Sequence, residues 1–130
     1  MSGPGRFKIE TDRKQAAYDQ LGGIADACRQ PNWDGYGAGA VEQDTVRNAS
    51  AFIEALPDAY PLPDITAEPD GHINLEWYRQ PRRILSVSVS PEGTLYWAAL
   101  LGIEDPRGSC PFSEDVPETI LYWLGRVCAE

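Results

Sequence analysis

Residues 72–78 read His-Ile-Asn-Leu-Glu-Trp-Tyr, residues 85–89 read Leu-Ser-Val-Ser-Val and residues 94–101 read Thr-Leu-Tyr-Trp-Ala-Ala-Leu-Leu. Apolar side chains recur at every second position, which is typical of β-strands because successive side chains point to opposite faces. Pro69-Asp70-Gly71 and Pro91-Glu92-Gly93 have the composition of tight turns, since proline fixes φ and glycine accepts a positive φ. The sequence therefore predicts an antiparallel meander of three to four strands between residues 64 and 101.

The same alternation assigns the two faces of the predicted sheet. Trp77, Val87 and Trp97 point to the apolar face, which we expect helices to cover. An antiparallel sheet can leave its other face in water. That face carries His72, Asn74, Glu76, Tyr78, Ser86, Ser88 and Tyr96. Between the first two of these strands, Arg79-Gln80-Pro81-Arg82-Arg83 is expected to form a longer, basic connection.

Helical spacing of apolar residues predicts three helices around the sheet. Two precede it, at about Asp12–Arg29 and Glu42–Leu56, and one follows it, from Pro117 to about Cys128. The predicted fold is α+β, with residues 1–130 in a single domain. Its core is expected to include Leu21, Ile53, Trp77, Val87, Trp97 and Leu124.

The remaining segments read as irregular structure or short strands. Residues 1–10 contain two glycines and a proline, so we expect a loose lead-in or a short edge strand around Phe7 and Ile9. After the meander, residues 105–109 are expected to form a turn. Residues 110–112 follow as a candidate for one more short strand.

The composition is that of a folded globular protein, because 42% of the 130 residues are hydrophobic and four are tryptophans. No apolar run approaches the ~18 residues that a membrane span requires. The start, Met1-Ser2-Gly3-Pro4-Gly5-Arg6, lacks the apolar segment of a secretory signal. We therefore expect a cytoplasmic protein that does not bind membranes.

The cysteines do not indicate a metal site. Cys28, Cys110 and Cys128 are odd in number and show no ligand spacing. A zinc site that joined them to His72 would need four distant residues to converge, whereas buried thiols in a reducing compartment need no such convergence. We predict no metal site and no cofactor.

Charge is uneven in total and along the chain. Twenty acidic and eleven basic residues give a net charge of −9, which disfavours direct binding to nucleic acid. Between Asn48 and Tyr78 there are six carboxylates and no Lys or Arg. Such a run is either a solvated surface or a site for a basic partner. The candidate partner-binding residues are Glu54, Asp58, Asp64, Glu68, Asp70, His72, Glu76, Tyr78 and Tyr96.

An enzyme would have to work with one histidine and scattered carboxylates. The best pair is His72 with Glu76, yet residues four apart on a strand lie ~13 Å apart, too far for direct proton transfer. A nucleophile elbow or oxyanion loop is also missing from the sequence. We predict that the protein is not an enzyme and has no catalytic residues.

Between the first two predicted helices lies a glycine-rich loop, Asn32-Trp33-Asp34-Gly35-Tyr36-Gly37-Ala38. Its glycine spacing matches neither the dinucleotide fingerprint nor the P-loop. A phosphate cradle at the start of the next helix is the functional alternative. The favoured interpretation is an ordered loop in which Trp33 and Tyr36 pack into the domain.

Four segments together resemble a small uncharacterised bacterial family: the glycine-rich loop, the helix end Ala55-Leu56-Pro57, the hairpin Pro69-Asp70-Gly71-His72-Ile73-Asn74-Leu75-Glu76-Trp77 and the strand Leu85-Ser86-Val87-Ser88-Val89. The resemblance covers most of the chain from Asn32 onward and implies no catalytic residues. In size, acidity and α+β layout the chain is also similar in type to phage-encoded anti-CRISPR proteins and to some immunity proteins.

These observations favour a binding protein, because a flat sheet face with two tyrosines beside an acidic stretch suits a basic protein surface. The sharpest form is an anti-defence inhibitor of a nucleic-acid-handling effector, with carboxylates standing where phosphates would lie. The alternative is an immunity protein or antitoxin that neutralises a basic toxin. A small-molecule sensor with a pocket between the Trp33 loop and the sheet, or a minor enzyme, is a further alternative. The oligomeric state stays open.

Overall fold

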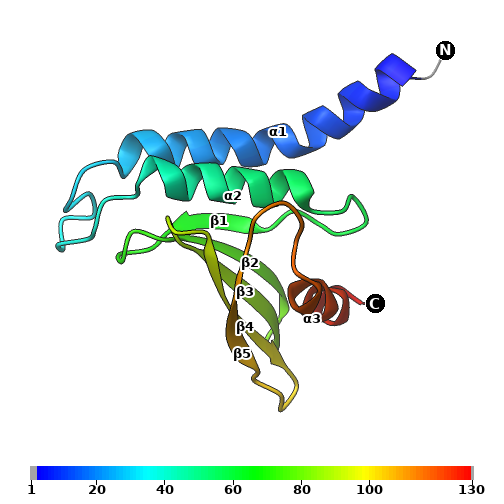
Figure 1. Ribbon diagram of the computed structural model, residues 1–130. Coiled ribbons are helices and arrows are strands. Elements are labelled where there is room, and N and C mark those ends of the chain that lie inside the picture. Colours follow the sequence, from blue (N-terminus) through cyan, green and yellow to red (C-terminus); the bar gives the residue numbers. More distant parts are fainter. Residues whose placement is uncertain (1–2, 130) are drawn as a thin grey trace.

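The computed structural model describes the backbone of residues 3–129 and the side chains of residues 13–129. The elements are α1 (Gly3–Ala27), α2 (Gln43–Ala55), β1 (Asp64–Ala67), β2 (Ile73–Gln80), β3 (Arg83–Val89), β4 (Thr94–Leu101), β5 (Arg107–Pro111) and α3 (Glu118–Cys128). Figure 1 shows α1 and α2 side by side over one end of the sheet, and α3 beside the sheet. The predicted α+β fold, with two helices before the sheet and one after it, is confirmed, and the meander has five strands.

The five strands form one antiparallel sheet in sequence order, β1-β2-β3-β4-β5. In the register Leu75 lies opposite Val87, and Val87 lies opposite Trp97. Glu76 pairs with Ser86 in the neighbouring row. Each hairpin therefore keeps apolar residues in line with apolar residues, because a shift of one position would move a whole strand to the wrong face.

The inner face of the sheet packs under the helices. It is formed by Ile73, Leu75, Trp77, Leu85, Val87, Val89, Leu95, Trp97 and Ala99. The Phe52 ring of α2 lies 6.3 Å from the Trp77 ring, and the Trp123 ring of α3 stacks 6.4 Å from the Trp97 ring. Five of the six predicted core residues are buried, namely Leu21, Ile53, Trp77, Val87 and Leu124. Trp97, the sixth, is partly buried and packs against this core.

Helix α1 is longer than predicted. It begins at Gly3, and Pro4 lies in its first turn, where a missing backbone N–H leaves no hydrogen bond unmade. The predicted lead-in or edge strand around Phe7 and Ile9 is therefore wrong, since both positions lie within α1. Helices α2 and α3 begin and end within about one residue of their predicted bounds. None of the described helices has both the length and the apolar content that crossing a membrane requires.

The connection between β2 and β3 is shorter than predicted. Strand β2 runs to Gln80 and β3 begins at Arg83, so only Pro81 and Arg82 form the turn. Arg82 has a φ of +67°, and the pairing register shifts between Tyr78 and Gln80. A proline followed by a residue with positive φ closes a tight turn, which explains why five residues with a basic composition do not form an open loop.

The predicted turn at residues 105–109 is wrong from Arg107 onward, because β5 spans Arg107–Pro111 and pairs with β4. Gly108 has the composition of a turn residue but faces Trp97 in the ladder. A Cβ atom at Gly108 would lie 3.1 Å from the Trp97 ring. The glycine therefore permits close packing of the tryptophan rather than a change of direction.

Candidate functional site

The outer face of the sheet consists of the side chains that alternate with those of the inner face. One row across it contains Thr66, Asn74, Ser88, Tyr96 and Ser109. The next row contains Asp64, Glu76, Ser86, Ala98 and Arg107. Within residues 3–129, the three helices lie on the inner side and none covers this face (Figure 1). Tyr78 and Tyr96 are accordingly 53% and 49% exposed.

A hollow of about 450 Å³ lies in the outer face, and we call it the outer-face hollow. It is lined by Glu68, Asn74, Ser86, Ser88, Tyr96, Trp97, Ala98, Arg107, Gly108 and Ser109. A second hollow of about 330 Å³ shares Ser86, Ala98 and Arg107 with it. Small side chains at Ser86 and Ala98 lower the surface between Tyr96 and Leu100. A depression of this volume is within the range of small-ligand and side-chain sites.

A hydrogen-bonded chain stands at one wall of the hollow. Ser88 Oγ donates to Glu68 Oε1 at 2.6 Å, and His72 Nδ1 lies 3.0 Å from Ser88 Oγ. The Ser88 hydroxyl has one proton, which is directed to the carboxylate, so His72 Nδ1 must carry the hydrogen of its own bond to Ser88. The imidazole also stacks on Tyr96, with ring centroids 5.8 Å apart and planes 16° apart. These contacts hold the wall in one arrangement.

The hydrogen bonds among Glu68, Ser88 and His72 do not activate the Ser88 hydroxyl as a nucleophile. A general base accepts the hydroxyl proton through a ring nitrogen, and a third group orients the ring through its other nitrogen. Here the proton points to Glu68 and His72 Nδ1 is a donor. Asp70 Oδ2 approaches the same nitrogen, at 3.6 Å. The arrangement therefore suits binding and positioning better than acyl transfer.

Glu68, Asp70 and His72 bring three metal-ligating atoms within 4.8 Å of one another. The sequence did not indicate this group, because its residues converge only through the tight β1–β2 turn. In that turn the Gly71 N–H donates to the Glu68 carbonyl, and the Glu68 N–H donates to the His72 carbonyl, each at 2.9 Å. Since His72 Nδ1 is protonated in the present network, a cation bound there would have to displace that proton and the bond to Ser88.

Seven of the nine predicted partner-binding residues lie on the outer face or at the β1–β2 turn: Asp64, Glu68, Asp70, His72, Glu76, Tyr78 and Tyr96. The other two, Glu54 and Asp58, lie on α2 and in the segment that follows it. Asp58 Oδ1 lies 3.6 Å from Arg13 Nη1 and 3.7 Å from Lys14 Nζ. The acidic run is continuous in sequence but divided in space.

Few carboxylates of the described side chains form ion pairs. Away from the outer face, three of the thirteen carboxylates at residues 13–129 have Lys or Arg partners, namely Asp44, Asp58 and Glu104. Among the side chains of residues 13–129, none of the following forms an ion pair with Lys or Arg: Asp64, Glu68, Asp70 and Glu76. We call these four the outer-face carboxylates. Asp64 and Glu76 lie directly opposite each other on β1 and β2, a placement of like charges that is destabilising.

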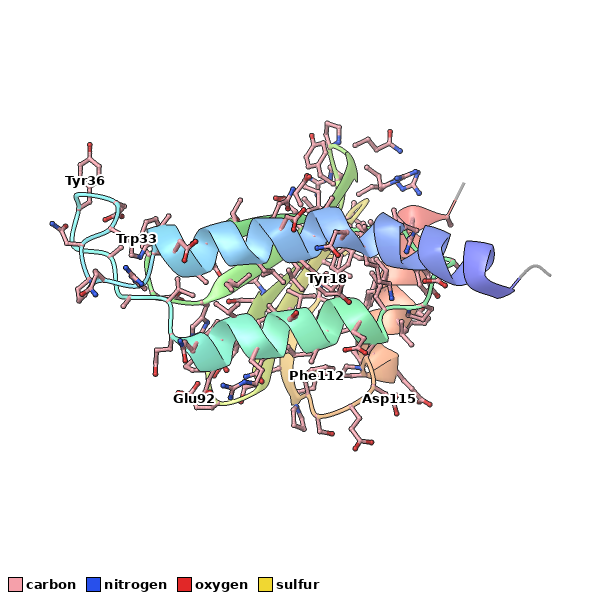
Figure 2. The ribbon with its side chains drawn as sticks, turned by 90° about the horizontal axis from the view of Figure 1, so that it is seen from above. Tyr18, Trp33, Tyr36, Glu92, Phe112 and Asp115 are labelled. Atoms are coloured by element: carbon pink, nitrogen blue, oxygen red, sulfur yellow. The ribbon has the colours of Figure 1, made fainter. Side chains whose placement is uncertain are left out.

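The glycine-rich loop is held by internal hydrogen bonds, and only one of its two aromatic residues packs as predicted. Oxygen atoms of the Asn32 and Asp34 side chains accept three backbone N–H groups of the loop, at 2.6 to 3.1 Å. These groups are therefore not free for a phosphate. Trp33 packs against the core, as predicted. Tyr36, predicted to pack inward, is 93% exposed and points away from the domain at the tip of the loop (Figure 2).

The loop is fixed to the same end of the molecule as the β1–β2 turn. The Gly39 N–H donates to the Pro69 carbonyl at 2.7 Å. Gly71 has a φ of +90°, and a Cβ atom there would lie 2.7 Å from the Ala40 carbonyl oxygen. Only glycine fits this crossing without displacement of the backbone. The contact fixes the position of the turn that carries Asp70 and leads to His72.

Three residues of the hollow, Arg107, Gly108 and Ser109, were predicted to lie in a turn and not in the sheet. Arg107 and Ser109 belong to β5. Their neighbours Pro106 and Gly108 are typical turn residues, so the segment was predicted to be a turn rather than a strand. The available signal was the length of the preceding connection, since a turn at residues 102–106 is long enough to bring the chain back to β4.

A hollow of comparable volume, about 470 Å³, lies on the helical side of the molecule. Arg13, Asp58 and Cys128 are among the side chains that line it. Two of its charged side chains already have partners, because Arg13 pairs with Asp58 and donates to the Tyr60 carbonyl. Burial also raises the pKa of the Cys128 thiol, against the opposing effect of two nearby arginines. A thiol whose pKa is raised is a poor nucleophile, because the thiolate is the reactive form.

Comparison with known proteins found no match for this chain: no protein-family model, no curated protein and no solved structure.

Proposed function

We propose that this protein is a non-catalytic inhibitor that acts in the cytoplasm by docking its outer face on a basic surface of a nucleic-acid-handling protein. The observation that carries the proposal is the gathering of the four outer-face carboxylates, none with a Lys or Arg partner among residues 13–129, beside two half-exposed tyrosines on a sheet face that no described helix covers. Carboxylates held on a folded surface stand where phosphates of a bound nucleic acid would lie. A net charge of −9 steers the protein toward such a surface and away from nucleic acid itself.

The aromatic residues of the face support docking on a protein. Tyr78 on β2 and Tyr96 on β4 each expose about half of their surface on the face that carries the carboxylates. Tyrosine combines a large apolar ring with a hydroxyl and is enriched in protein interfaces. The Asp64–Glu76 opposition adds a driving force, because a cation placed between two like charges removes their repulsion. Docking therefore relieves an unfavourable feature of the free protein.

The first experiment is to capture the partner from bacterial lysate and identify it by mass spectrometry. The proposal expects a basic protein that binds nucleic acid, and an effector nuclease or a toxin are the two outcomes consistent with it. Association kinetics with that partner then test the surface. The rate constant for association is expected to fall steeply between low and physiological ionic strength, because steering by charge is screened by salt.

Charge reversal gives the decisive comparison. Replacement of Glu68, Asp70 and Glu76 by lysine changes the net charge from −9 to −3, since each substitution adds two positive charges. Reversal of the exposed Asp19, Asp26 and Glu114 gives the same net charge away from the outer face. The first variant should associate at least about tenfold more slowly at low salt, and the second should lose less. Equal losses, or turnover of a substrate by the pure protein alone, would refute the proposal.

A further inference from the structure

The outer-face hollow has one wall that is ready to receive a cation. Glu68 uses Oε1 to accept the Ser88 hydroxyl, while Oε2 makes no hydrogen bond or ion pair with the side chains described at residues 13–129. The carboxylate is partly buried and held in position by Ser88 and, through it, by His72. A charged oxygen that is fixed and unpaired binds a donor without loss of further side-chain freedom.

An aromatic ring flanks the same wall. The Tyr96 ring is 49% exposed and is held by its stack on His72, so one side of it faces the hollow. Guanidinium and ammonium groups are attracted to the faces of aromatic rings, and Arg also stacks on them. The floor beyond Tyr96 is formed by Ala98 and the backbone at Gly108, which suits the apolar stem of a long side chain.

Arg107 also lines the hollow, but its backbone position is away from that of the Ser88–Glu68 pair. Arg107 lies on β5 in the row of Ala98, whereas Glu68 reaches Ser88 on β3 in the neighbouring row. Two strand spacings and two residues along the strand separate the Ser88 and Arg107 backbones, about 12 Å in all. Arg107 also shares the second hollow with the carboxylates of Glu76 and Asp105.

We infer that the outer-face hollow is the receptor for one arginine side chain of the partner, with the guanidinium on Tyr96 and Glu68 and the stem over Ala98. The inference rests on the proposed function, because it names the group of the basic partner that the outer face takes in. It adds a specific pocket to the general attraction between charges. Arginine is favoured over lysine because its planar group both stacks on a ring and donates to a carboxylate.

The test uses two peptides, acetyl-Gly-Arg-Gly-amide and its citrulline counterpart, which has nearly the same shape but no charge. In amide NMR spectra of the full chain, the arginine peptide should shift the signals of Ser86, Ser88, Tyr96 and Ser109 in a saturable way. The citrulline peptide should bind about tenfold more weakly, the loss expected for removal of one charge-assisted contact. Equal binding of the two peptides, or shifts elsewhere on the chain, would overturn the inference.

Two variants check the location. Ala98→Leu fills the floor of the hollow at an exposed position of β4, and its control is Ala16→Leu at an exposed position of α1. Ala98→Leu should abolish the arginine-dependent shifts, and Ala16→Leu should preserve them. Glu68→Gln keeps an oxygen that can accept the Ser88 hydroxyl but removes the charge, and it should weaken arginine binding about tenfold. Undiminished binding by Ala98→Leu contradicts the assignment even if the Gln variant fails to fold.

Binding to the partner tests the arginine site separately from the docking surface. Ala98→Leu should raise the dissociation rate constant of the partner and leave the salt dependence of association unchanged. If Ala98→Leu binds the partner normally while the triple charge reversal does not, the proposed docking surface is supported and the proposed arginine site is refuted. If neither affects the partner, both proposals fail.

Discussion

Trp77 and Tyr78 are neighbours on β2, yet the first is 2% exposed and the second 53% exposed. The difference comes from the alternation of the strand, since α2 and α3 cover only one side of it. Apolar residues on the inner face are restrained by packing on every side, so changes there alter stability. Exposed residues on the outer face lack this packing, so most substitutions there are expected to change stability little. We therefore expect the inner face of the strands to stabilise the fold and the outer face to bind the partner.

The largest expected effect comes from the inner face. Trp77→Ala should lower the free energy of unfolding by about 3 to 5 kcal/mol, because it removes a buried ring that packs against Phe52. It also removes the donor of a 2.8 Å hydrogen bond to the Pro61 carbonyl. Tyr78→Ala, one residue away on the outer face, should change stability by no more than about 0.5 kcal/mol. Urea unfolding curves of both variants measure the contrast. Similar midpoints would show that the face assignment is wrong.

The next effect concerns the turn that holds the outer-face wall in place. Gly71→Ala should destabilise the protein by about 1 to 3 kcal/mol, because φ is +90° and the new Cβ would meet the Ala40 carbonyl oxygen. The control is Gly23→Ala in α1, where nothing lies within 4 Å. That change should stabilise the protein by up to about 1 kcal/mol, since alanine is the better helix residue. Thermal unfolding separates the opposite signs, and a stabilising Gly71→Ala would mean that the turn is not held by this crossing.

The rate of thiol alkylation compares the three native cysteines with an exposed position on the outer face. Burial raises the pKa of the Cys28, Cys110 and Cys128 thiols from the ordinary 9.0, so the reactive thiolate is depleted at pH 8. Alkylation of all three should be slower than for a free thiol, and Cys28, which is buried, should react most slowly. A cysteine introduced as Ala98→Cys on the outer face should react at the rate of an exposed thiol. Peptide mapping after timed alkylation gives the four rates, and equal rates would remove the distinction between the sides.

The raised pKa values of these thiols also predict how the free energy of unfolding changes at alkaline pH. A thiol whose pKa is raised by folding favours the folded state while it is neutral. This contribution is present below about pH 9 and is lost as the pH rises above the unfolded thiol value. The free energy of unfolding should therefore fall in this range for the native protein. Replacement of Cys28 by Ala, compared with native protein at each pH, should reduce the slope.

The smallest expected effect is that of metal removal. Glu68, Asp70 and His72 lie close enough to hold a cation, but His72 Nδ1 donates to Ser88 in the folded chain. We expect a chelator to leave the melting temperature unchanged. A stoichiometric zinc signal in the purified protein, or a lower melting temperature after chelation, would overturn this and would assign the outer-face wall to a metal.

The sequence alone determined that three helices surround an antiparallel meander, and it assigned the two faces of the sheet. The period-two pattern of β2, β3 and β4 depends only on backbone geometry, because a strand alternates its side chains whatever it packs against. The pattern correctly assigned Trp77 to the core and Tyr78, Ser88 and Tyr96 to the outer face. It failed at Gly108, where local composition indicated a turn and pairing with β4 produced a strand.

Only the tertiary structure decided which charges stand alone. Asp58 and Glu68 belong to one acidic run in the sequence, but Asp58 meets Arg13 and Lys14 across the fold. Glu68 reaches Ser88, and its second oxygen has no partner among the side chains of residues 13–129. Contacts between distant segments depend on strand register and helix packing, and neither leaves a trace in the spacing of charged residues. The exposure of Tyr36 follows the same rule. An aromatic residue in a loop packs inward only if the fold places a surface beneath it, and here the surface lies beneath Trp33.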